Sequence, residues 1–257
     1  FLHKPPVEAN LNELIAGKHP AQQSLIKEEL VAHMLCAGIL KNELEGRTGP
    51  IMKKISDEEE GFLNSLPFDL TNAQKKVWQE IKQDLTSEMP MRRLLQGDVG
   101  SGKTLIGALA ALHSRSNEWQ TALLCPTEIL AEQHYESFKG WFENLGVSVN
   151  LLTGSTKAKE RKLITRDLKD GNIDIIVGTH AIFQLGIKFA NLGLTIIDEQ
   201  HRFGVHQRFS MLEKGGKEKM SPHQSIMTAT PIPRTLAMTV YGSLETSIID
   251  ELPPGRN

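Results

Sequence analysis

A glycine-rich octapeptide, Gly-Asp-Val-Gly-Ser-Gly-Lys-Thr at residues 97–104, constrains the fold of this chain more than any other feature. It matches the pattern G-x-x-x-x-G-K-[ST], whose backbone N–H groups surround phosphates while the lysine reaches the outer ones. An apolar run precedes it and a helical stretch follows, as such a loop requires. We therefore expect a site for a nucleoside triphosphate with Mg²⁺, in which Thr104 is a metal ligand. The binding residues are Gly97, Gly100, Ser101, Gly102, Lys103 and Thr104.

From residue 92 onward, short apolar runs alternate with helical stretches. The expected strands are 93–96, 122–125, 147–152, 174–177, 194–197, 225–227 and 247–249, and the expected helices are 103–113, 128–142, 157–170, 205–213 and 233–241. This alternation predicts an α/β fold with a mostly parallel sheet and helices on both faces. Ligands of such sheets bind at the carboxyl ends of the strands.

Two adjacent carboxylates, Asp198 and Glu199, follow the apolar run 194–197. An isolated acidic pair at a strand end is usually a solvated turn. Carboxylates that end a buried strand instead need a cation or a hydrogen-bond donor nearby, and the phosphate loop implies one. We expect Asp198 to hold Mg²⁺ and Glu199 to orient or deprotonate the attacking water, which makes Lys103, Asp198 and Glu199 the catalytic candidates.

The first third of the chain predicts helices and a connector. Residues 1–17 have little pattern, a helix is expected from Pro20 to before Gly46, and a capping box at residue 56 opens a short helix. A second capping box, residues 71–74, opens a helix with apolar residues at steps of four. Gln74 could complete that cap or present its amide to an adenine edge, and both remain open. We expect a helical linker over 1–66 and a nucleotide-binding domain over 67–257.

Small or polar residues follow several other expected strands. Such groups can bind backbone phosphates of a nucleic acid without reading its bases, although any one of them is more often an ordinary helix cap. Thr228-Ala229-Thr230 could form a hydroxyl relay between the carboxylates and a polynucleotide. The candidates for DNA binding or coupling are Thr127, Thr153, Gly154, Thr179, His180, His201, Thr228 and Thr230.

Composition bounds the remaining possibilities. The net charge of −2 gives no global sign of nucleic-acid binding, so a DNA-binding surface must be a local patch. The two cysteines, Cys36 and Cys125, lack metal-ligand spacing and favour a reduced, cytoplasmic protein, and no apolar run suggests a membrane partner. The chain begins at Phe1 and ends in a linker-like stretch, so we expect a piece of a longer protein.

The order of these motifs resembles superfamily 2 helicases. The longer strings at 97–104, 177–181, 198–208 and 228–237 resemble the bacterial RecG family of ATP-dependent DNA helicases. The resemblance implies a RecA-like, P-loop NTPase fold, ATP and Mg²⁺ as cofactors, and adenine contact by Gln74. It also implies branched DNA (forks and Holliday junctions) as the partner of a monomer. It also implies a wedge domain and a second RecA-like domain elsewhere in the polypeptide, without which this piece should hydrolyse ATP poorly.

Two other functions are compatible with the motifs. One is a double-stranded DNA translocase like the transcription-repair coupling factor Mfd, which shares residues 228–236 but usually carries Glu-Glu-Gln where this chain has residues 199–201. The other is a DNA-binding module that closes on ATP without hydrolysing it. Glu199 argues against the second, because such a switch has less use for a water-activating carboxylate.

Overall fold

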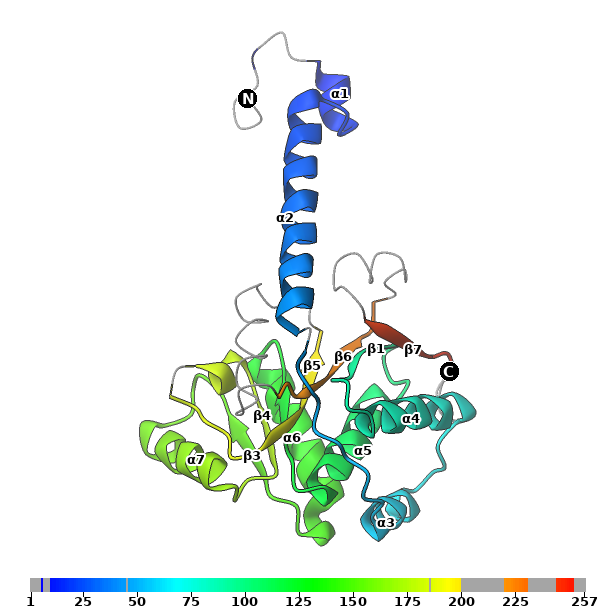
Figure 1. The fold of residues 1–257 in the computed structure, drawn as a ribbon, viewed down its shortest axis with the longest axis vertical. Coiled ribbons are helices and arrows are strands. Elements are labelled where there is room, and N and C mark those ends of the chain that lie inside the picture. Colours follow the sequence, from blue (N-terminus) through cyan, green and yellow to red (C-terminus); the bar gives the residue numbers. More distant parts are fainter. Residues whose placement is uncertain are drawn as a thin grey trace. The chain divides into compact units, whose positions relative to one another are not determined.

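The computed structural model describes residues 6, 10–44, 46–184, 186–199, 220–230 and 244–251 (Figure 1). The chain divides into two compact units, residues 1–45 with 233–243 and residues 46–232 with 244–257. The expected helices at 205–213 and 233–241, and the candidate His201, lie outside the described residues. Among the described helices, none combines the length and apolar character needed to cross a bilayer.

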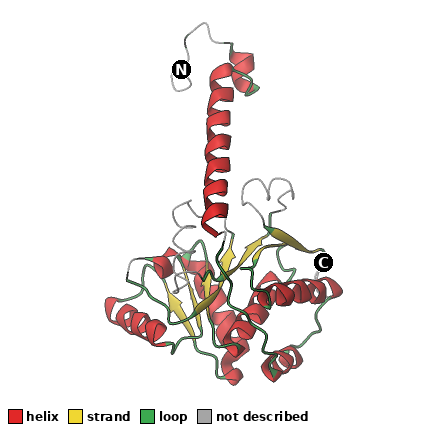
Figure 2. Cartoon of the chain, viewed as in Figure 1, coloured by secondary structure: helices red, strands yellow, loops and turns green. Residues whose placement is uncertain are grey.

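The larger unit is built on a parallel sheet, as the alternating pattern predicted (Figure 2). Its described strands lie in the order β3-β4-β2-β5-β6-β1-β7, and every pairing is parallel. β1, which precedes the phosphate loop, lies between β6 and β7. The strands are β1 (Arg92–Gly97), β2 (Gln120–Leu124), β3 (Val149–Leu152), β4 (Ile175–Gly178), β5 (Leu192–Asp198), β6 (His223–Thr228) and β7 (Glu245–Ile249).

Helices connect β1 to β2, β2 to β3 and β3 to β4, close to the ranges expected from the sequence. One deviation is a 3₁₀ helix directly after β4, where the sequence predicted only a polar strand end. The helices among the described residues of this unit are α3 (Asp57–Ser65), α4 (Asn72–Leu85), α5 (Lys103–Ser116), α6 (Glu128–Phe142) and α7 (Ala158–Asp170), with short 3₁₀ helices η1 (Glu143–Leu145) and η2 (His180–Phe183). The α/β fold with a parallel sheet is thus confirmed.

Both faces of the sheet are apolar. Successive strand residues point to opposite faces, and apolar side chains occupy both sets of positions. Leu123, Val177 and Ile196 join the core cluster formed with α4, α5 and α6. Their neighbours Leu124 and Ile176 point to the other face and are equally buried. Continuous apolar strands of this kind are typical of parallel sheets, which are covered on both sides.

The stretch from residue 46 to 66, expected as part of the linker, packs into the larger unit. Met52 and Phe62 are fully buried in the same cluster as α4 and α5. His223 of β6 holds this stretch in place through two hydrogen bonds. Its Nδ1 accepts from Met91 N at 2.8 Å, and its Nε2 donates to Pro50 O at 2.7 Å. Because a backbone N–H only donates and a carbonyl only accepts, the His223 ring is the neutral Nε2–H tautomer. The domain boundary at 66/67 stays a prediction.

Glu59 of α3 forms a buried polar cluster with α4 and α5. Its Oε1 accepts hydrogen bonds from Trp78 Nε1 and Lys82 Nζ, both at 2.8 Å, and its Oε2 lies 3.8 Å from His113 Nδ1. Burial raises the pKa of Glu59, but the donors from His113, Lys82 and Trp78 outweigh it and lower the pKa to about 2. The cluster therefore anchors α3 through a carboxylate that must be ionised.

The described part of the smaller unit contains two helices, α1 (Leu11–Ile15) and α2 (Pro20–Leu44). α2 begins at the predicted Pro20, whereas α1 falls in a segment expected to be an unpatterned connector. α1 forms because the Asn10 side chain accepts from the N–H groups of Asn12 and Glu13, which caps a single turn. On α2 several large apolar side chains are more than two-fifths exposed, namely Leu25, Ile26, Leu30, Val31, Met34 and Leu35.

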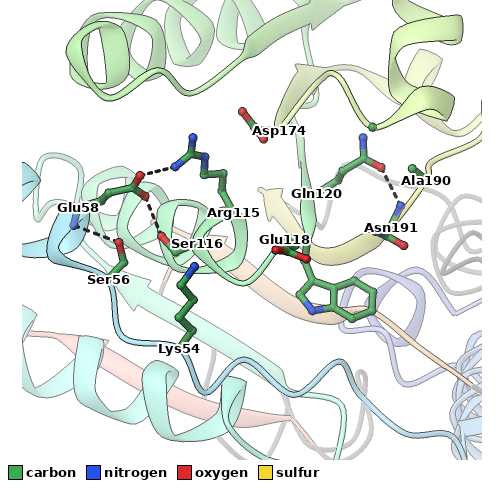
Figure 3. A pocket seen from close by; sticks show the side chains of 12 residues that line it. Lys54, Ser56, Glu58, Arg115, Ser116, Glu118, Gln120, Asp174, Ala190 and Asn191 are labelled. Carbon is green, nitrogen blue, oxygen red and sulfur yellow. Dashed lines mark hydrogen bonds and ion pairs between the residues drawn. The ribbon is translucent and has the colours of Figure 1, made fainter.

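A cavity of about 460 Å³ opens at the amino ends of the strands, opposite to the edge where the motifs lie (Figure 3). Arg115 and Glu58 pair across it, and Ser116 Oγ donates to the same carboxylate at 2.9 Å. Gln120 accepts from Asn191 N at 3.0 Å. The groups named here pair with one another, and the predicted site residues lie at the opposite, carboxyl edge of the sheet.

Candidate nucleotide-binding and catalytic site

Three neighbouring strands bring the predicted motifs together. The phosphate loop follows β1, Asp198 and Glu199 end β5, and Thr228-Ala229-Thr230 ends β6, which pairs with both β1 and β5. The carboxyl ends of adjacent parallel strands lie at one edge, so segments 30 and 130 residues apart in sequence meet in space. This juxtaposition is the framework of the candidate site.

The phosphate loop has a left-handed backbone, which favours glycine, at two of its positions. Gly100 and Gly102 have φ of +85° and +93°, and Gly102 is the residue before α5. A Cβ at Gly102 would lie 2.3 Å from Gln74 Nε2, and one at Gly97 would lie 2.5 Å from Ser101 Oγ. The loop is therefore closely packed against its neighbours, with the amino terminus of α5 directed into it.

Gln74 is a structural brace of this loop. Its Oε1 accepts from Thr71 N at 2.9 Å, which completes the predicted capping box, and its Nε2 donates to Ser101 O at 2.7 Å. The side chain is almost fully buried. The capping function that the sequence left open is thus present, together with a contact to the loop that sequence reasoning did not include. Adenine contact by Gln74 stays a prediction.

Lys103, the first residue of α5, carries the positive charge of the phosphate loop. Its Nζ donates to the carbonyls of Gly97 and Asp98, at 2.6 and 2.9 Å. Burial lowers the pKa of Lys103, and the negative charges of Asp198, Glu199 and Asp98 act against that lowering. The ammonium therefore lies in the field of both predicted carboxylates, as a triphosphate site requires.

Asp198 is held by a side chain from α6. His134 Nε2 lies 2.9 Å from Asp198 Oδ2, and both side chains are largely buried, at 12% and 14% exposure. Cys125, buried at the end of β2, also lies in the field of this carboxylate: burial raises the pKa of its thiol, and the charge of Asp198 raises it further. Asp198 is thus a fixed carboxylate at the edge of the sheet.

Glu199 links β5 to the loop after β6. Its Oε1 accepts from Ala229 N at 2.9 Å and its Oε2 accepts from Thr228 Oγ1 at 3.3 Å. Thr228 Oγ1 lies 2.9 Å from Thr230 Oγ1, so the two threonines and the carboxylate form a connected chain. The backbone of Glu199 is left-handed, with φ of +52°. These contacts connect the threonines to the carboxylate, and their role as a relay to a polynucleotide stays a prediction.

The structure also fits a bound nucleotide with a cation. Ser101 Oγ is buried in the loop and has no hydrogen-bond partner among the described residues, so it is available to a ligand. Thr104 lies in the first turn of α5 and is partly exposed. A hydroxyl and a carboxylate are oxygen donors of the kind that Mg²⁺ takes.

Comparison with known proteins agrees with this geometry. The family profile described as "DEAD/DEAH box helicase" matches residues 71–239, which include the loop, both carboxylates and the threonines. The chain belongs to this helicase family.

This DEAD/DEAH box helicase chain is 54% identical over 256 residues to "ATP-dependent DNA helicase RecG" of Pasteurella multocida, covering 100% of the chain and 37% of the relative. It is 51% identical over 255 residues to the protein of the same name from Escherichia coli (strain K12), covering 99% of the chain and again 37% of the relative. The predicted resemblance to RecG is confirmed. The helicase chain spans just over a third of the length of these curated relatives.

Solved structures give the same result. The helicase chain matches "Structure of RecG bound to three-way DNA junction" with a TM-score of 0.76 and 45% identity, covering 90% of this chain and 30% of that one. A structure described as "Crystal Structure of DUF1998 helicase MrfA bound to DNA" matches with a TM-score of 0.61 at 18% identity, which shows the shared fold alone.

The remaining candidate DNA-binding residues of the helicase chain follow strands β2, β4 and β3, which form the other half of the sheet. Thr127 caps α6 by accepting from Leu130 N at 3.3 Å, and Thr153 Oγ1 lies 2.9 Å from Ser155 Oγ. Thr179 Oγ1 is buried without a partner among the described residues, and His180 beside it is exposed. These residues share the carboxyl edge with the nucleotide site, and their role in DNA binding stays a prediction.

The sequence does not reveal the contacts that two residues of this edge make. His134 lies in the helix predicted at 128–142 and follows the cap Thr127 by seven residues, which is about two helical turns along the same face. Glu128 accepts from Ser155 N at 3.1 Å and from Ser155 Oγ at 2.8 Å, and so holds the turn after β3. Its only sequence signal was its place at a strand end.

Proposed function

We propose that this chain binds ATP with Mg²⁺ at the carboxyl edge of β5, β6 and β1. We further propose that, within a longer polypeptide, it hydrolyses ATP to remodel branched DNA such as stalled forks and Holliday junctions. The observation that carries the proposal is that the phosphate loop after β1 and the carboxylates that end β5 lie at one edge, on either side of β6. Its similarity to proteins named ATP-dependent DNA helicase RecG supports the proposed reaction.

The residues of the loop have separate tasks in this proposal. The backbone N–H groups at the start of α5 and the free Ser101 hydroxyl bind phosphate oxygens. Lys103 exchanges its present acceptors, the carbonyls of Gly97 and Asp98, for the outer phosphate oxygens. Thr104 and Asp198 would hold Mg²⁺, which when bound neutralises the charge that develops on the phosphates.

Glu199 orients the attacking water and accepts its proton. Its two oxygens already receive hydrogen bonds from Ala229 N and Thr228 Oγ1, which fix the carboxylate. The same two bonds join the catalytic carboxylate to the loop after β6. A shift of Thr228 or Thr230 on DNA binding would therefore move Glu199, which is how we propose that DNA controls hydrolysis.

The track for DNA lies on the other half of the edge in this proposal. Thr127, Thr153, Gly154, Thr179 and His180 follow β2, β3 and β4, and hydroxyls there can contact phosphates without reading sequence. The solved relative described as bound to a three-way DNA junction supports branched DNA as the partner. A reduced, cytoplasmic setting and a monomeric state belong to the same proposal.

Two substitutions in the longer protein test the assigned roles. Lys103→Ala should lose nucleotide binding and hydrolysis together. Glu199→Gln should bind nucleotide within about threefold of wild type and lose DNA-stimulated hydrolysis by about 100-fold or more, the size expected for a missing general base. Glu245→Gln is the matched control, because it neutralises an exposed carboxylate at the start of β7. Retained turnover in Glu199→Gln would remove Glu199 from its role.

A second experiment tests the dependence on other parts of the polypeptide. The 257-residue chain should show little DNA-stimulated ATP hydrolysis beside the longer protein measured at equal concentration. Equal rates would show that the 257-residue chain hydrolyses ATP without help from the other parts of the polypeptide.

A further inference from the structure

We infer that His134 is a positioning residue for the proposed metal ligand Asp198, and that α6 thereby joins the DNA-facing edge to the nucleotide site. This inference rests on the proposed function. It concerns one hydrogen bond and the helix that carries it, and neither the motif pattern nor the family match assigns a role to His134.

The first turn of α6 is fixed to the half of the edge assigned to DNA. Thr127 caps the helix, and Glu128 accepts two hydrogen bonds from Ser155 in the turn after β3. Gly154 in that turn is closely packed as well, since a Cβ there would lie 3.0 Å from Glu128 Oε1. A displacement of the 153–155 turn would therefore be transmitted to the start of α6.

About two turns further along, the same helix reaches the carboxylate of Asp198. His134 Nε2 lies 2.9 Å from Asp198 Oδ2. An ionised carboxylate can only accept hydrogen bonds, so His134 donates through Nε2. Both side chains are largely buried, which makes the bond stronger than an exposed one and fixes the direction of the carboxylate.

The geometry leaves the other oxygen of Asp198 for the cation. A histidine on Oδ2 restricts rotation of the carboxylate, whose charge acts on the Lys103 ammonium, and it leaves Oδ1 for the cation. Hydrogen-bond partners of this kind orient metal ligands, and removing them typically weakens metal binding by about 10- to 100-fold. His134 would act on Asp198 alone and touch neither nucleotide nor metal.

Nucleotide binding measured with and without Mg²⁺ tests the inference without using turnover. The 257-residue chain is titrated with a fluorescent, non-hydrolysable ATP analogue at increasing Mg²⁺. His134→Leu removes the donor, whereas His134→Gln places an amide N–H near the position of Nε2. Ser137→Ala, an exposed change on α6, is the matched control.

We expect His134→Leu to need about tenfold more Mg²⁺ for half-maximal tightening of nucleotide binding, with Mg²⁺-free affinity unchanged within about twofold. His134→Gln should need no more than about threefold more, and Ser137→Ala should match wild type. Should the leucine variant fail to fold, His134→Asn, whose amide is too short to reach, should show the same shift in Mg²⁺ requirement.

Wild-type Mg²⁺ dependence in a folded leucine or asparagine variant would overturn the inference and leave the proposed function intact. A glutamine variant as impaired as the leucine variant would also overturn it, because the donor would then not be the cause. A wild-type chain whose nucleotide binding ignores Mg²⁺ would overturn the proposed function, and this inference with it.

Discussion

The Glu59 cluster gives a prediction whose size follows from the structure. The carboxylate has a pKa of about 2 in the folded chain and 4.5 as its ordinary value. At about 1.4 kcal/mol per pKa unit, ionised Glu59 contributes roughly 3 kcal/mol to the free energy of unfolding at pH 7. Glu59→Gln keeps the shape of the side chain and should remove most of that contribution.

The direction of the Glu59 pKa shift determines how its contribution to stability changes with pH. Because the folded pKa of Glu59 is lowered, its contribution is complete above pH 4.5 and is lost as the pH falls toward 2. The stability difference between wild type and Glu59→Gln should therefore be about 3 kcal/mol at pH 7 and should shrink by roughly 2 kcal/mol by pH 3.

Urea unfolding followed by tryptophan fluorescence measures this difference, because Trp78 donates directly to Glu59. Glu60→Gln is the control: it removes the same charge from the next residue of α3, which is exposed. Its stability should stay within about 0.5 kcal/mol of wild type, as for other surface changes. A Glu59→Gln difference that is below 1 kcal/mol at pH 7, or that is the same at pH 7 and pH 3, would refute the reasoning.

Three further predictions concern single positions. Gly102→Ala should weaken nucleotide binding at least about tenfold, since φ is +93° and the new Cβ would lie 2.3 Å from Gln74 Nε2; an unchanged affinity in a binding titration would contradict the packing of the loop. Gly178→Ala should fail to give soluble folded chain, because its Cβ would lie 1.9 Å from Leu152 O and force β3 from β4; a native circular dichroism spectrum would speak against it. Burial lowers the pKa of His223, so the unfolded chain binds a proton at this ring more readily than the folded chain does. The free energy of unfolding is therefore unaffected by this titration above pH 6.5 and declines as the pH falls below that value. Urea unfolding at pH 7.5 and 5.5 should show this decline in wild type and a smaller one in His223→Asn.

The fold and the phosphate site could be predicted from sequence because their signals are local. Alternating apolar runs give the parallel sheet, and glycines at residues 100 and 102 are required by positive φ. The meeting of Lys103 with Asp198 and Glu199 followed from one rule, that strand-end loops share an edge. None of these inferences needed the detailed packing.

Contacts between elements that are distant in the sequence could not be predicted in the same way. The bond from His134 to Asp198 joins residues 64 apart, and nothing in the helical pattern of α6 distinguishes a histidine that donates to a carboxylate from a solvated one. The packing of residues 46–66 into the core was also hidden, since Met52 and Phe62 lie in a segment without strong periodicity. Gln74 shows an intermediate case: the capping box was visible, but the bond to Ser101 depends on tertiary structure.

The strand order has a consequence for how this chain acquires its site during synthesis. Among the described strands, β1 pairs only with β6 and β7, and β5 reaches β1 only across β6. As the ribosome releases the chain from its amino end, the phosphate loop and both carboxylates emerge before the strand that joins them. A nascent chain that stops short of His223 would contain every residue of the loop and both acids, yet it would lack the strand that pairs with both β1 and β5.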